Sequence, residues 1–128
     1  MKRESQSLKK ISNFIEVNGI GTVRMEDNSL RDVFVYGYFK MFHWWFIVHQ
    51  DVNDLEYMVV SEASSGAILT EYCYPTVENA LRAALPIIEE KRFYFSTSVG
   101  DILVKNGSNL MRRNISLQTL SVDIALWS

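Results

Sequence analysis

The residues with the greatest chemical capacity are two histidines, one cysteine and several acids in the middle of the chain. His43 and His49 are six positions apart, so on one continuous strand they would share a face. With Cys73 or Asp51 they would begin a zinc site, but no pair has the close spacing of a specific zinc motif. Cys73, His49 and Asp51 would also form a nucleophile, a base and an orienting acid if the fold assembled them. No family signature surrounds Cys73, so we predict no catalytic residue, metal or cofactor.

Charge is distributed unevenly along the chain. Between Lys40 and Arg82 there is no lysine or arginine. Glu56 and Glu62 would share one side of a strand by parity, and Glu71 would lie on the returning strand. This predicts a negative surface that either engages the basic groove of another protein or is a solvated edge that discourages aggregation. The acidic residues of this span are Asp51, Asp54, Glu56, Glu62, Glu71 and Glu78.

Trp44 and Trp45 are adjacent, so on a strand their side chains must point to opposite faces. One indole is expected in the core beneath a helix. The other is exposed, covered by the N-terminal segment or buried in a partner. Exposed aromatic residues can stack single-stranded bases, but such platforms need nearby Lys and Arg, and the neighbours here are acidic. Core packing is expected ahead of either function, and of the two functions contact with a protein is favoured.

These residues belong to a predicted β-β-α unit. Residues 44–49 and 56–61 have the aromatic and β-branched composition of strands, and Ser64-Ser65-Gly66 predicts a hairpin turn. Residues 67–74 would return as a strand that stops at Pro75. Thr76 is a suitable N-cap for a helix whose apolar stripe is Val77, Ala80, Leu81, Ala84, Leu85 and Ile88.

The flanking segments complete an α+β fold, an antiparallel sheet of about five strands with helices on one face. The pattern predicts a short helix over residues 4–17. It predicts strands over residues 22–25, 32–39 and 93–95. The segment 115–127 fits a strand or a helix equally well, since its apolar residues match both periods.

Size and composition predict one domain, residues 1–128, with ordinary globular hydrophobicity of 48%. No apolar run approaches the roughly 18 residues of a membrane span, and residues 1–7 lack the apolar core of a signal peptide. Cys73 is the only cysteine, which indicates a reducing compartment. We therefore expect a cytoplasmic protein that does not engage a membrane.

The hairpin followed by Thr76-Val77-Glu78-Asn79-Ala80 and a helix resembles a unit common in small phage-encoded proteins and in some antitoxins. The unit covers about a third of the chain and is generic, because one helix packed on a hairpin is easily formed. The resemblance assigns no functional residue.

Together these features predict a small, non-enzymatic protein-binding module. One form is an anti-defence inhibitor from a mobile element, whose acidic sheet face blocks the basic groove of a nucleic-acid-binding host protein. An alternative is a small-ligand binder or enzyme with a pocket between sheet and helix, using His49, Cys73 and nearby carboxylates. A third is a nucleic-acid binder that uses scattered basic pairs, although direct nucleic-acid binding is not expected. Homodimerisation is left open. The predicted protein-binding residues are Asp51, Asp54, Glu56, Glu62, Glu71, Trp44 and Trp45.

Overall fold

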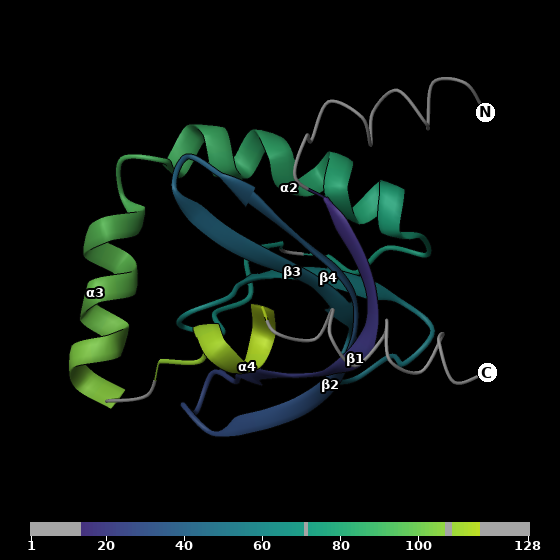
Figure 1. The fold of residues 1–128 in the computed structure, drawn as a ribbon, viewed down its shortest axis with the longest axis horizontal. Helices are drawn as coiled ribbons and strands as arrows, with labels where there is room; N and C mark the ends of the chain where they lie inside the picture. The colour runs from purple at the N-terminus through teal and green to yellow at the C-terminus, as the bar shows by residue number, and fades with distance from the viewer. Residues whose placement is uncertain (1–13, 71, 107–108, 116–128) are drawn as a thin grey trace.

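The computed structural model describes residues 14–70, 72–106 and 109–115. Across these residues the strands β1 to β4 pair antiparallel in chain order, and three helices accompany them (Figure 1). The α+β class is confirmed, with four strands where the sequence predicts about five. The elements are β1 (Ile15–Arg24), β2 (Leu30–Met41), β3 (Trp44–Gln50), β4 (Met58–Glu62), α2 (Val77–Lys91), α3 (Phe95–Asn106) and α4 (Met111–Ile115).

The expected fifth strand, residues 67–74, returns beside β4 without forming a continuous ladder. Bridges join Ser61 to Ile68 and Met58 to Tyr74. Between them, the Leu69 N–H donates to the Val60 carbonyl at 2.7 Å. The Val60 N–H donates to the hydroxyl of Thr70 at 3.2 Å. A side chain thus replaces the backbone partner, and this interrupts the ladder.

The sheet curls until the end of β1 meets the turn that follows β4. The Arg24 N–H donates to the Gly66 carbonyl at 2.9 Å. Gly66 has a φ of 74°, and a Cβ there would lie 2.8 Å from the Arg24 nitrogen, so only glycine fits. The turn predicted at Ser64-Ser65-Gly66 is therefore confirmed, and it also closes the curl.

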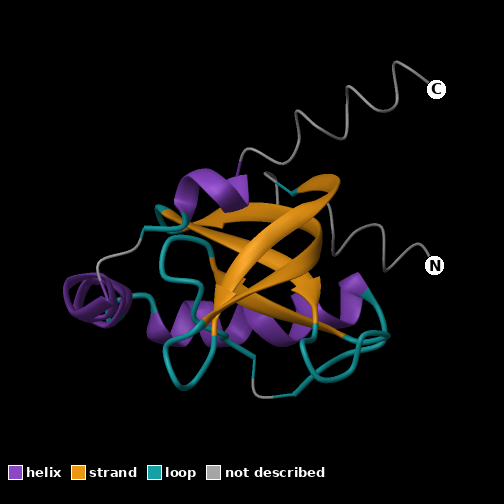
Figure 2. Ribbon diagram, turned by 90° about the horizontal axis from the view of Figure 1, so that it is seen from below, coloured by secondary structure: helices purple, strands orange, loops and turns teal. Residues whose placement is uncertain are grey.

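Both faces of the sheet are buried, each beneath a different helix. On β3, Phe46 and Val48 pack with α2, whereas Ile47 belongs to a second cluster that α4 covers through Met111 and Ile115. Figure 2 shows α2 and α4 on opposite sides of the curled sheet. The expectation of helices on one face is therefore wrong. A curled sheet has an apolar concave side as well as a convex one, and each must be covered.

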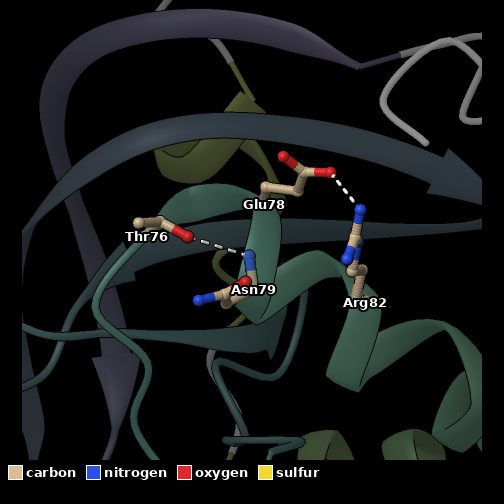
Figure 3. A network of polar contacts seen from close by, with 4 residues as sticks. All are labelled: Thr76, Glu78, Asn79 and Arg82. Atoms are coloured by element: carbon tan, nitrogen blue, oxygen red, sulfur yellow. Dashed lines mark hydrogen bonds and ion pairs between the residues drawn. The ribbon is translucent and has the colours of Figure 1, made fainter. Parts of the chain in front are cut away.

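Helix α2 begins as the sequence predicts. The Thr76 hydroxyl accepts a hydrogen bond from the Asn79 N–H at 3.0 Å, and Arg82 forms an ion pair with Glu78 at 2.8 Å (Figure 3). Pro86 lies inside the helix on its exposed side, where the lost hydrogen bond is tolerated. The buried residues of α2 are Ala80, Leu81, Ala84 and Ile88, all members of the predicted stripe.

Two other predictions on the flanks are wrong or lie outside the described residues. Residues 15–17 of the predicted helix 4–17 belong to β1, and residues 1–13 lie outside the described part. The predicted strand 93–95 is a turn leading into α3, where Phe95 and Val99, four residues apart, are both buried. Three consecutive aromatic residues are typical of a strand, but the four-residue spacing of Phe95 and Val99 belongs to a helix. Of the segment 115–127, only Ile115 is described, as the end of α4.

Candidate functional site

The structure separates the predicted acidic residues. Glu62 is only 2% exposed, and its carboxylate accepts hydrogen bonds from the N–H groups of Ser64 and Ser65 at 2.7 and 2.9 Å. The Ser64 hydroxyl donates to it as well, at 2.7 Å. The expectation that Glu62 contributes to an exposed acidic face is therefore wrong. Glu62 is held inside because it satisfies the N–H groups of the turn that closes the sheet.

Three of the other acidic residues lie in one loop, whereas Glu78 lies on α2 and pairs with Arg82. Asp51 is half-buried after β3, and Asp54 and Glu56 are exposed before β4. Two backbone hydrogen bonds fold this loop, from the Asp51 N–H to Tyr57 at 2.8 Å and from the Tyr57 N–H to Asp54 at 3.0 Å. Glu71 lies outside the described residues. The negative charge of Asp51, Asp54 and Glu56 therefore lies on a loop rather than on a face of the sheet.

His49 has no exposed surface and uses both ring nitrogens. Nδ1 lies 2.7 Å from the Gln50 carbonyl, which can only accept, so Nδ1 carries the proton. Nε2 lies 2.7 Å from the Ser61 hydroxyl and accepts a hydrogen bond from it. Burial lowers the pKa of His49 from 6.5 to about 4, although the bond to Gln50 opposes this. The pair resembles a nucleophile and its base, but Ser61 is also fully buried and has no access to a substrate.

Cys73 and Asp51 share a cleft of about 1020 Å³ that His49 does not line. Its lining comes from the β1–β2 turn, the β3–β4 loop, the segment after β4 and Ile102 of α3. The predicted nucleophile and acid therefore line the same cleft, without the predicted base. In the described part of the chain, no three His, Cys, Asp or Glu side chains gather closely enough to hold a metal ion.

The two tryptophans lie on opposite faces of the sheet, as their adjacency predicts. Trp44 packs against the first core cluster, with its ring 6.0 Å from that of Phe95. Trp45 packs against the second cluster, edge-on to Tyr38 at 5.5 Å, with Lys40 over its ring at 5.8 Å. Both indoles are half-buried, so each combines core packing with an accessible surface.

At one end of the sheet, the β2–β3 turn lies beside the connection from α2 to α3, at the upper left of Figure 1. A groove of about 630 Å³ separates them, lined by Phe42, His43, Trp44, Arg92 and Phe93. These five residues are called the aromatic corner below. Phe93 is 76% exposed, and Tyr94, next in the chain, is 67% exposed. Large aromatic side chains exposed together are unusual unless they have a partner.

The backbone of the aromatic corner is strained. Phe42 and His43 form a two-residue hairpin turn with φ values of 52° and 74°. A turn with positive φ at both positions strongly favours Asn-Gly, because a bulky side chain there is crowded by the backbone. Each such residue costs about 1 kcal/mol or more. The chain therefore has a Phe-His pair at a turn where Asn-Gly would make the protein more stable.

Replacing His43 by glycine is expected to raise the free energy of unfolding by about 1 kcal/mol, because glycine adopts positive φ without crowding. Urea unfolding at neutral pH measures the change. Lys40→Gly, at a strand position two residues before the turn, is the matched control and should lower stability. A loss of stability in His43→Gly would mean that the imidazole contributes more than the strain costs.

Comparisons with models of known protein families, with curated proteins and with solved structures find no significant match. No helix within residues 14–70, 72–106 and 109–115 has the length and apolar content to cross a membrane.

Of the aromatic corner, Trp44 is among the site residues predicted from the sequence, whereas Arg92 and Phe93 are not. It assigned Phe93 to a strand, where alternate residues would be covered. One signal was available: three consecutive aromatic residues follow the charged end of α2, and a surface element cannot bury all three.

Proposed function

We propose that this chain is a non-enzymatic protein-binding module whose contact surface is the aromatic corner. The observation that carries the proposal is the coincidence of exposed aromatic side chains with strained backbone. Strained residues cluster at functional sites, where the surrounding structure enforces them. Aromatic and arginine side chains also contribute most of the binding energy at protein interfaces.

The energetics of burial support this surface as an interface. Covering a phenylalanine that is 76% exposed contributes about 2 kcal/mol to binding. Phe42 and Trp44 are already packed against the core, so binding needs little further ordering of their side chains. Preordered aromatic groups beside a groove are typical anchors of an interface.

The placement of the chemically capable residues supports binding over catalysis. His49 and Ser61 form a hydrogen-bonded pair without exposed surface. Cys73 lines the cleft beside the β3–β4 loop, and the base expected for it is held elsewhere. A catalytic base must reach the proton that it removes, and His49 has no such path from the cleft.

A second candidate function is the inhibitor that presents carboxylates to a basic groove. Exposed Asp54 and Glu56 favour it, since both lie in one ordered loop. Glu62 adds no exposed charge to this surface, because its carboxylate accepts hydrogen bonds from the turn that closes the sheet. The smaller charge makes this candidate weaker than the aromatic corner, because steering grows with the number of complementary charges.

Affinity capture tests the proposal with the chain and two matched variants as baits in lysate of the cells that make it. Phe93→Ala removes an exposed ring of the aromatic corner, and Asp54→Lys/Glu56→Lys reverses the acidic loop. Neither variant touches a buried residue, so both should fold. We expect Phe93→Ala to retain at least tenfold less of the enriched protein, and the charge-reversed bait to retain it, measured by quantitative mass spectrometry.

Two results would overturn the proposal. If the enriched protein is lost from the charge-reversed bait and kept by Phe93→Ala, the acidic loop is the contact surface. If no protein is enriched over empty matrix on any bait, the chain does not act as a protein-binding module under these conditions, and the binding function is rejected.

A further inference from the structure

Arg92 occupies an unusual position in the aromatic corner. It follows the last residue of α2, and its guanidinium lies 5.2 Å from the ring centroid of Phe42 and 4.6 Å from that of Phe93. No ion pair or hydrogen bond of its guanidinium occurs within residues 14–70, 72–106 and 109–115. The cation is therefore positioned by two rings and has no carboxylate of its own among those residues.

The ring contacts prepare this cation for a ligand. Attraction between a guanidinium and aromatic faces restricts the side chain. It does not use the N–H donors, which lie in the guanidinium plane and match a carboxylate in a two-bond fork. The ordering of the long side chain is thus partly complete before a ligand arrives, which lowers the cost of binding.

The surrounding charges favour a carboxylate over a nucleic-acid backbone. Lys91 is adjacent to Arg92, and Lys40 lies two residues before the turn. Glu89 and Glu90, both exposed at the end of α2, oppose a chain of phosphates. Binding single-stranded nucleic acid requires a continuous basic groove as well as aromatic rings. One positioned arginine beside apolar side chains instead fits a single acidic group within an apolar segment.

We propose that Arg92 binds a carboxylate, from Asp or Glu, on an apolar segment of a partner protein whose neighbouring apolar side chain enters the groove between Phe42 and Phe93. This inference rests on the proposed function and names the chemistry of its partner. The carboxylate forms a forked pair with the guanidinium, and the apolar side chain covers the exposed ring of Phe93. Neither contact requires the buried core to move.

A display library of random 12-residue peptides, selected against the full chain, tests the inference. We expect enriched peptides to contain one Asp or Glu within a few residues of an aromatic or large aliphatic residue. Binding of the synthesised consensus peptide should weaken about tenfold or more in Arg92→Gln, and also when its acid is replaced by the amide. Arg92→Lys should restore only part of the affinity, because lysine lacks the fork. Lys91→Gln, the same charge change one residue away, should alter affinity less than about twofold.

The outcomes distinguish the carboxylate inference from the protein-binding function on which it rests. Nuclear magnetic resonance shifts show whether the peptides bind at the aromatic corner. If they bind there but lack an acid, or bind Arg92→Gln equally well, the carboxylate inference is wrong and the protein-binding function stands. If no selected peptide binds there, both are wrong. Tighter binding of labelled single-stranded DNA or RNA at the corner would also overturn the inference, as would a dimer of the chain that Arg92→Gln dissociates.

Discussion

Asn114→Ala is expected to lower the free energy of unfolding by about 3 kcal/mol, because it leaves three buried backbone groups without partners. Asn114 has no exposed surface. Its Oδ1 accepts the Thr22 N–H at 2.8 Å, and its Nδ2 donates to the carbonyls of Thr22 and Ala63, both at 2.9 Å. Chemical unfolding at neutral pH, followed by tryptophan fluorescence, measures the loss.

The size of this effect follows from where the amide lies. Thr22 belongs to the edge strand β1, and Ala63 directly follows β4, the last strand of the sheet. The side-chain amide pairs with Thr22 as the backbone of a neighbouring strand would, and it ties that edge to the far end of the sheet. Asn114 thus holds the curl closed, and its loss exposes the second core cluster to water.

Two variants make this prediction specific. Arg113→Ala removes the exposed neighbour in the same helix and should change stability by less than about 0.5 kcal/mol. Gly21→Ala should also destabilise the chain, because a Cβ at Gly21 would lie 2.6 Å from both the Asn114 Oδ1 and the Val35 Cγ2. If Asn114→Ala unfolds at the wild-type urea concentration, the amide does not hold the sheet closed.

Acidification from pH 7 to pH 5 is expected to lower the free energy of unfolding by about 2 kcal/mol through His49 alone. Burial holds the folded pKa of His49 at about 4, below its ordinary value of 6.5. Between these values the unfolded chain binds a proton that the folded chain rejects. The stabilisation is therefore complete above the unfolded pKa and is lost as the pH falls towards the folded one.

The environment of His49 offers little compensation for a charge beyond the Gln50 carbonyl, which accepts a hydrogen bond from Nδ1. Its cross-strand neighbours are Val35 and Val59, and the Ser61 hydroxyl donates to the ring that would be protonated. Protonation would make Nε2 a donor, so the Ser61 hydroxyl would have to rotate and accept, and it would place a cation among largely apolar groups. The cost falls on the middle of the sheet, where the two central strands pair.

His49→Gln removes the titration and isolates its contribution. The wild type should lose about 2 kcal/mol more than this variant between pH 7 and pH 5, in urea unfolding at each pH. Parallel stability curves for the wild type and His49→Gln would contradict the low folded pKa.

The sequence by itself determined the local structure that depends on residues close to one another in the chain. Thr76 and Asn79 are three positions apart, so the start of α2 could be recognised from the pattern. The stripe on α2, the glycine turn at Gly66 and the strand from Trp44 depend on periodicity or on a single backbone requirement. The opposed orientation of Trp44 and Trp45 follows from the two-residue repeat of a strand.

The tertiary structure alone decided the features that depend on how the sheet curls. Asn114 meets Thr22 across 92 positions of the chain, and no local pattern specifies that contact. The same closing turn takes the Glu62 carboxylate inside, so its charge could not be assigned to a surface in advance. Phe42 and Arg92 become neighbours only because α2 returns along the sheet to the β2–β3 turn. Periodicity indicates which side of a helix or strand is buried. The curvature of the sheet decides which distant elements meet, and the aromatic corner forms where two such elements meet.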